Sequence, residues 1–216
     1  SVIWAAGLLL SGAMAVRALR PGMGLLWGLA AALTAPVVAI VLELTWQPAE
    51  TIGAYPWALH AVALAAVMVC LALRFARADG PDRTRASVFV LSALAAITFA
   101  LVLILSLAAL TVALAVTVLV AAWLDRQFKL PLMQVFIAVG VAAVGARLVG
   151  DPGLAWALDA PLWEMAMAYG GALVAFVAGL VVLRGMDRMP ARILLDTAAW
   201  STGGMLVSLL LIRFLD

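Results

Sequence analysis

The chain has 216 residues, of which 68% are hydrophobic and only 11% are charged. Its mean hydropathy of +1.21 is far above that of a water-soluble domain, which argues against a soluble helical bundle. The formal net charge is +2, but the basic residues are dispersed in short groups between apolar runs, so no nucleic-acid partner is expected.

Eight apolar runs follow one another, and most reach the ~18 residues that are typical of a membrane span. They cover residues 2–16, 22–46, 56–73, 86–105, 107–124, 131–149, 162–183 and 193–212. None alternates apolar and polar residues as the strands of a membrane β-barrel do. The predicted fold is an all-α, polytopic transmembrane helical bundle of about eight spans in four antiparallel hairpins. A single transmembrane region is expected over residues 1–216.

Pro36 interrupts the second run. Because proline lacks an N–H group, it should kink or locally unwind this helix and free a backbone carbonyl that a neighbouring helix must satisfy. Both a packing bend and a functional kink are compatible with the sequence.

The stretch from Ala86 to Leu124 carries no charge. At ~1.5 Å per residue, a single helix of this length would be nearly twice as long as the ~30 Å hydrocarbon core is thick. We therefore predict two helices with a turn between about Leu103 and Ala109. The Ser106 hydroxyl is expected to help satisfy the carbonyls that the turn frees.

The basic residues are distributed unequally between alternate connections. Short cytoplasmic loops collect Lys and Arg, so the richer set is predicted to face the cytoplasm. This set holds eleven of the 13 basic residues, namely Arg17, Arg20, Arg74, Arg77, Arg83, Arg85, Arg126, Lys129, Arg184, Arg188 and Arg192. The asymmetry predicts a multi-pass protein of the bacterial inner (cytoplasmic) membrane.

Four ionisable residues near the opposite ends of the helices form a candidate polar site. Glu43 and His60 should lie at similar depth, either as a proton-sensitive pair or as two anchors that reach the interface separately. Arg147 and Glu164 flank the last outer connection, where an interfacial salt bridge is the simplest expectation. Ionisable groups within a membrane are costly, so these four are the natural candidates for function.

The sequence offers no catalytic constellation. With one histidine and the single Cys70, a histidine-rich metal site, a Cys/His pair and an intrachain disulfide are all unavailable. We also find no phosphate-binding or dinucleotide-binding motif. Neither a cofactor nor a metal is expected, and the chain is predicted not to be an enzyme.

Two segments resemble a family of bacterial membrane proteins. These are Trp123-Leu-Asp-Arg-Gln-Phe-Lys-Leu-Pro131 and Ala146-Arg-Leu-Val-Gly-Asp-Pro152, followed by Tyr169-Gly170 and Leu211-Ile-Arg213. Over residues 105–216 the chain is similar to DUF2339, a domain of unknown function. The resemblance implies that the chain is a fragment of a longer protein with more spans, and it implies no substrate.

Three functional classes remain open. A non-catalytic membrane module or complex subunit would have the bilayer and the rest of its chain, or other membrane subunits, as partners. A transporter would bring Pro36, Glu43, His60 and Arg147 to a cavity near the midplane, whereas an enzyme would gather carboxylates at one interface. The scarcity of intramembrane charge favours the first class.

Overall fold

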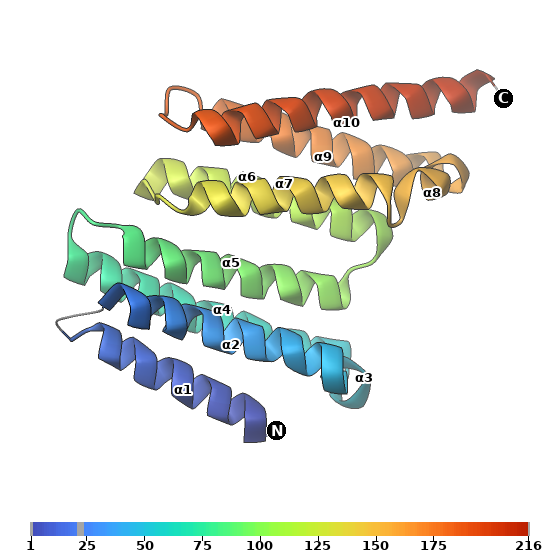
Figure 1. The fold of residues 1–216 in the computed structure, drawn as a ribbon. Coiled ribbons are helices and arrows are strands. Elements are labelled where there is room, and N and C mark those ends of the chain that lie inside the picture. Colours follow the sequence, from blue (N-terminus) through green and yellow to red (C-terminus); the bar gives the residue numbers. More distant parts are fainter. Residues whose placement is uncertain (1, 21–23, 216) are drawn as a thin grey trace. The chain divides into compact units, whose positions relative to one another are not determined.

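The computed structural model describes residues 2–20 and 24–215, and this part of the chain folds into ten α-helices without a β-strand (Figure 1). The helices are α1 (Val2–Ala18), α2 (Gly24–Trp46), α3 (Pro48–Ile52), α4 (Ala54–Asp79), α5 (Thr84–Ile104), α6 (Leu107–Phe128), α7 (Met133–Val149), α8 (Gly153–Asp159), α9 (Leu162–Val182) and α10 (Met189–Leu215). Helices suit these apolar runs because every backbone hydrogen bond closes within the segment. The all-α prediction is confirmed.

Six helices are long and apolar enough to cross a membrane, namely α2, α4, α5, α6, α9 and α10. Helices α7 and α8 meet the same criterion together but are bent by 53° at the break between them, and the apolar α1 has only 17 residues. Each of the eight expected runs therefore corresponds to a helix, and the polytopic bundle is confirmed. The expected start of the second run at residue 22 lies outside the described residues.

The uncharged stretch from Ala86 to Leu124 is broken where a turn was predicted. Helix α5 ends at Ile104 and α6 begins at Leu107, with Ser106 in an extended conformation between them. Leu107 has a positive φ of 45°, which helps to change the chain direction. The expected role of Ser106 is not observed, because the hydrogen bonds of the described residues include neither a capping bond of its side chain nor a bond from its hydroxyl to a carbonyl.

Two short helices, α3 and α8, were not predicted. Helix α3 has five residues and α8 has seven, and they follow α2 and α7 in the connections that carry few basic residues. Such segments are too short for a periodic apolar pattern to reveal them.

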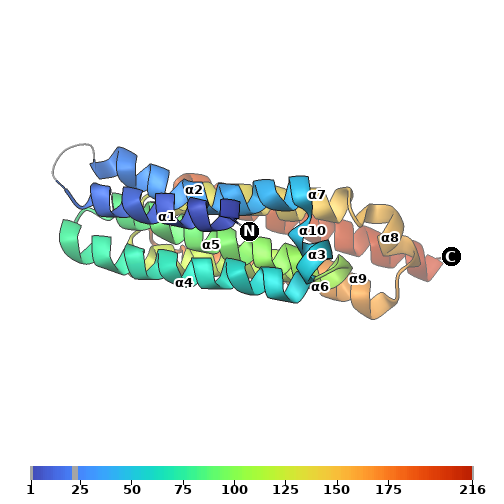
Figure 2. The ribbon, with the colours of Figure 1, turned by 90° about the horizontal axis from the view of Figure 1, so that it is seen from below.

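The chain divides into two compact units. The first comprises Ser1–Ile104 with Leu130–Leu132, and the second comprises Leu105–Lys129 with Met133–Asp216. The hairpins α1–α2 and α4–α5 build the first unit, and α6–α7 and α9–α10 build the second (Figures 1 and 2). The four predicted hairpins are therefore present. That residues 1–216 act as a single transmembrane region remains a prediction.

Alanine dominates the core of the first unit. Ala31, Ala32, Ala35 and Ala39 are at most 2% exposed and share one side of α2. Small side chains let helix backbones approach closely, which is how helices associate within a membrane. The Ser11 hydroxyl on α1 adds a hydrogen bond to the Ala31 carbonyl at 2.5 Å. Close packing and one polar bond thus fix α1 against α2.

The second unit uses glycine in the same way. A Cβ atom added at Gly171 of α9 would lie 3.0 Å from Cγ2 of Val112 on α6. On the other side of α9, the buried Tyr169 hydroxyl donates to the Leu148 carbonyl at 2.6 Å. These contacts bind α9 to both helices of the preceding hairpin.

Candidate functional site

Pro36 lies within α2, which continues without interruption to Trp46. A proline at this position removes the N–H that would bond the carbonyl four residues earlier, at Ala32. The Ser92 hydroxyl of α5 donates to this same carbonyl at 2.7 Å, and the contact is buried. The expectation that a neighbouring helix satisfies the freed carbonyl is therefore confirmed, while the expected unwinding of the helix is not observed.

A very small cavity lies beside Pro36. Its volume is about 10 Å³, and its lining consists only of proline, alanine, isoleucine, leucine and phenylalanine side chains. A buried water needs a similar volume together with two to four polar partners, which this lining does not offer. The space beside Pro36 is thus a packing defect in an apolar core.

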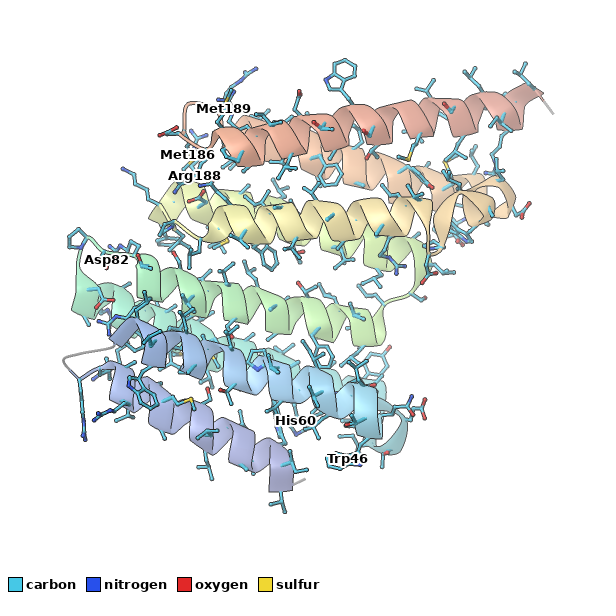
Figure 3. All side chains as sticks on the ribbon, viewed as in Figure 1. Trp46, His60, Asp82, Met186, Arg188 and Met189 are labelled. Carbon is cyan, nitrogen blue, oxygen red and sulfur yellow. The ribbon has the colours of Figure 1, made fainter. Side chains whose placement is uncertain are left out.

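Glu43 and His60 each bond to a backbone group nearby in the sequence. The half-buried Glu43 carboxylate accepts a hydrogen bond from the Ala49 backbone N–H of α3 at 3.3 Å. His60 is exposed, and its Nδ1 lies 2.7 Å from the Pro56 carbonyl oxygen, so Nδ1 carries the proton. No ion pair joins Glu43 to His60, so the proton-sensitive pair is not observed, and the other alternative, two anchors that reach the interface separately, stays a prediction. Figure 3 shows His60 and Asp82 at opposite ends of the first unit.

Arg147 and Glu164 are also not joined by an ion pair. The Arg147 guanidinium instead donates to the Thr111 hydroxyl and the Leu107 carbonyl, both at 3.4 Å. These contacts tie α7 to the start of α6. Glu164 lies in the first turn of α9, where the helix dipole stabilises a negative charge. The expected salt bridge is wrong, because Arg147 bonds to α6 and Glu164 lies at the start of α9.

Arg147 and Arg213 are the two basic residues outside the set of eleven predicted to face the cytoplasm, and Arg213 also has a local partner. Its guanidinium donates to the carbonyl oxygens of Leu158 and Ala160 at the C-terminal end of α8. The last carbonyls of a helix lack partners within it, and a cation satisfies them well. Arg213 therefore holds α10 against α8 within the second unit.

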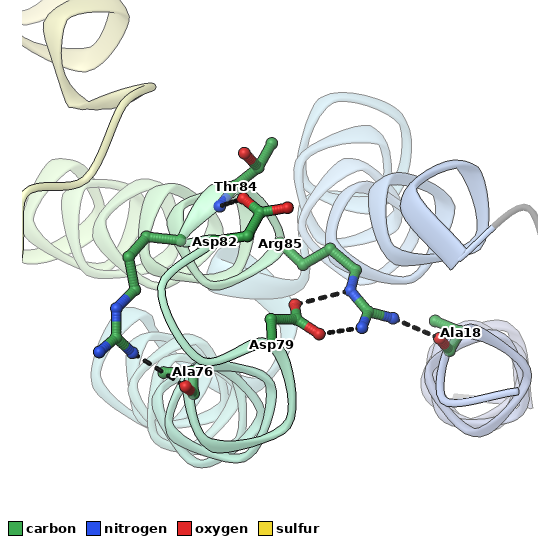
Figure 4. Close-up of polar contacts among 7 residues, drawn as sticks. Ala18, Ala76, Asp79, Asp82, Thr84 and Arg85 are labelled. Atoms are coloured by element: carbon green, nitrogen blue, oxygen red, sulfur yellow. Dashed lines mark hydrogen bonds and ion pairs between the residues drawn. The ribbon is translucent and has the colours of Figure 1, made fainter. Parts of the chain in front are cut away.

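An arginine–aspartate pair ties three helices of the first unit together. Asp79 is the last residue of α4, and its carboxylate receives two hydrogen bonds from Arg85 at the start of α5 (Figure 4). Arg85 also donates to the Ala18 carbonyl at the end of α1, at 2.5 Å. Its guanidinium lies over the Phe75 ring, 4.8 Å from the centroid, and Phe75 in turn stacks on Phe89.

The second unit contains a similar pair, which is more deeply buried. Asp125, in the last turn of α6, is 0% exposed and accepts two hydrogen bonds from Arg188, at 2.7 and 3.1 Å. Arg188 lies in the connection between α9 and α10, and its bonds to Asp125 raise the pKa of the guanidinium above its ordinary value. The neighbouring Arg126 donates to the Val182 carbonyl, the last residue of α9, at 2.5 Å. The pair therefore connects α6 with the α9–α10 hairpin.

Sequence reasoning missed these two pairs, although a signal was present. Asp79 and Asp125 are carboxylates in the last turns of helices, where the helix dipole disfavours negative charge. Arg85 and Arg188 lie at or just before the start of a helix, where the helix dipole disfavours positive charge. A charge that the helix dipole disfavours is stabilised by a neighbouring charge of opposite sign. In each pair the aspartate and the arginine stabilise each other in this way.

Comparisons with known proteins identify the family without assigning an activity. No curated protein and no solved structure matches the chain. A family described as "Predicted membrane protein (DUF2339)" matches residues 1–216, so the family covers the first hundred residues as well as the expected 105–216. With its several apolar helices, the chain is a multi-pass membrane protein and belongs to the DUF2339 family.

Proposed function

We propose that this chain is a non-catalytic structural module of a larger protein or complex in the bacterial inner membrane. The observation that carries the proposal is the hydrogen bond from Ser92 to the carbonyl that Pro36 leaves free. A helix that bends or unwinds during transport needs backbone groups that change partners. Here the buried Ser92 hydroxyl donates a hydrogen bond to the freed carbonyl, and α2 remains continuous.

Other polar side chains within each unit support the same interpretation. Ser11, Tyr169 and Arg147 each donate to an atom of a different helix, and the two arginine–aspartate pairs do the same. Such bonds fix helix positions and are the usual use of polar groups inside a membrane bundle. The location in the inner membrane rests on the charge asymmetry of the connections.

The alternative is a transporter with a polar site near Glu43, His60 and Arg147. Flux measurements on the full-length protein in proteoliposomes distinguish the two functions. A trapped pH-sensitive dye reports proton flux, and osmotic swelling reports the entry of glycerol. If the protein is a structural module, liposomes that contain the wild type should be no more permeable than protein-free liposomes. The same should hold for liposomes that contain Glu43→Gln, His60→Gln or Arg147→Gln. A flux that any of these substitutions abolishes, with unchanged protein abundance, would contradict the proposal.

A second measurement follows assembly directly. Membranes are solubilised gently, and the size of the complex that contains the protein is compared by native electrophoresis. We expect a species larger than the protein alone, which Asp125→Ala depletes because it disrupts the second unit and which Glu43→Gln leaves intact. Migration as a monomer in every variant would contradict a role in a complex.

A further inference from the structure

An open groove of about 570 Å³ lies in the first unit between the end of α1 and the last turns of α4. Its lining comprises Leu19 after α1, and Cys70, Leu73, Arg74, Arg77 and Ala78 of α4. The α4 residues follow an i, i+3, i+4, i+7, i+8 spacing, so they share one helix face. The groove is therefore built from a single face of α4, closed on one side by the segment that ends α1.

The polarity of the groove changes along α4. Cys70 and Leu73 form its apolar end towards the middle of the helix, and the arginines lie near the helix terminus. From Cys70 to Ala78 the groove extends about 12 Å along the axis, at ~1.5 Å per residue. Because α4 is a candidate membrane span, the arginine end lies near the membrane boundary and the Cys70 end lies at the depth of lipid chains.

The two arginines of the groove have charges that are free to bind a ligand. The ion pairs of the described residues are Asp79–Arg85 and Asp125–Arg188, so neither Arg74 nor Arg77 is neutralised by a carboxylate there. Asp79, the nearest acidic residue along α4, is already engaged by Arg85. Both groove arginines are exposed, and no described hydrogen bond holds them.

We propose that this groove binds an anionic phospholipid, with the phosphate between Arg74 and Arg77 and an acyl chain along Leu73 and Cys70. Guanidinium groups bind phosphate oxygens through charge-assisted, often bidentate hydrogen bonds. Basic pockets at the ends of membrane helices are suited to anionic headgroups, and the apolar end matches the chain of the same molecule. The site does not depend on whether the protein is a scaffold or a transporter.

Cys70 provides a reporter inside the groove, because its thiol is free and exposed. The full-length protein in mixed micelles is treated with N-ethylmaleimide, and alkylation of Cys70 is followed by mass spectrometry. Phosphatidylglycerol should slow this reaction in a saturable manner, and phosphatidylcholine at the same concentration should not. The rate with lipid is divided by the rate without it, which cancels differences in intrinsic reactivity between variants.

The double variant Arg74→Gln/Arg77→Gln should raise the half-protecting concentration of phosphatidylglycerol about thirty-fold, because each arginine contributes ~1 kcal/mol near an anionic surface. Lys129→Gln/Arg184→Gln removes the same charge from exposed positions of the second unit and should leave that concentration unchanged. Arg74→Lys/Arg77→Lys keeps the charge and should retain most of the protection.

Three results would overturn the proposal. Equal protection by phosphatidylcholine would mean that the groove selects no charge. Protection that survives Arg74→Gln/Arg77→Gln would place the lipid elsewhere. Saturable protection by inorganic phosphate at the same concentration would identify a soluble anion as the occupant. An increase in the unfolding temperature with phosphatidylglycerol, lost in the same variant, would give independent support.

Discussion

Ser92 supplies the hydrogen bond that Pro36 cannot make. Its hydroxyl lies 2.7 Å from the Ala32 carbonyl oxygen, and Ser92 and Ala32 are 5% and 0% exposed. No water is available to a carbonyl at this depth, so leaving it without a hydrogen bond would reduce the stability of the fold. The bond turns a potential weak point of α2 into a contact between α2 and α5.

Removing this hydroxyl should destabilise the first unit. Ser92→Ala leaves the Ala32 carbonyl without a partner, and we expect a loss of ~1–2 kcal/mol in the free energy of unfolding. Pro36→Ala restores the backbone N–H, so Pro36→Ala/Ser92→Ala should recover much of that loss. Unfolding in mixed micelles by increasing SDS gives all four values of the cycle. Strictly additive effects would mean that the two residues are not coupled.

The second unit should lose more stability when one residue of the Asp125–Arg188 pair is replaced than when both are replaced. Asp125→Ala leaves a guanidinium beside an empty, buried position and should cost ~3–5 kcal/mol. Replacing both residues with apolar ones, Asp125→Leu/Arg188→Met, removes the charges together and should cost much less. The same SDS unfolding assay compares these variants. A double variant as unstable as Asp125→Ala would show that the ion pair itself contributes most of the stability.

Gly171 marks a close contact between α9 and α6. Gly171→Val forces a side chain against Val112 and should destabilise the second unit by ~1–3 kcal/mol. Gly170→Val is the matched control, because a Cβ atom there meets nothing within 4 Å. Val112→Ala should partly rescue Gly171→Val by making room. The unfolding temperature in detergent measures each change, and equal effects at the two glycines would refute this contact.

Asp82, in the connection between α4 and α5, should give a small pH dependence at acidic pH. The Thr84 backbone N–H donates to its carboxylate at 2.9 Å, and this bond lowers the pKa of Asp82. The stabilisation is therefore present above the ordinary pKa and disappears as the pH falls through the lowered one. Asp82→Ala should reduce the unfolding temperature near neutral pH and have little effect at about pH 3. A difference that is constant with pH would contradict this assignment.

The sequence was sufficient for those features that depend on local chemistry. Apolar runs located the helices, the excessive length of the run through Ser106 required a break, and Pro36 required a donor from another helix. The identity of that donor was not predictable, because many hydroxyls line the runs and only packing selects Ser92. Asp125 was missed because it lies in a charged segment that resembles a loop, whereas α6 continues to Phe128 and turns the carboxylate inwards.

The candidate polar site was the least predictable part. Glu43, His60, Arg147 and Glu164 were grouped by depth alone, and depth does not determine which helix face a side chain occupies. The contact of Glu43 comes from Ala49, in a short helix outside the apolar runs, whereas His60 bonds to Pro56 within its own run. That Pro36, Glu43, His60 and Arg147 converge on a cavity remains a prediction of the transporter alternative.

Amide hydrogen exchange across Pro36 tests the central claim, a static packed module, most directly. The full-length protein is placed in lipid nanodiscs, and exchange is followed in peptides that cover residues 30–42. A continuous, packed α2 predicts slow exchange on both sides of Pro36, with faster exchange in Ser92→Ala and recovery in Pro36→Ala/Ser92→Ala. Fast exchange of this segment in the wild type, unchanged by Ser92→Ala, would show a water-accessible hinge and contradict the structural-module account.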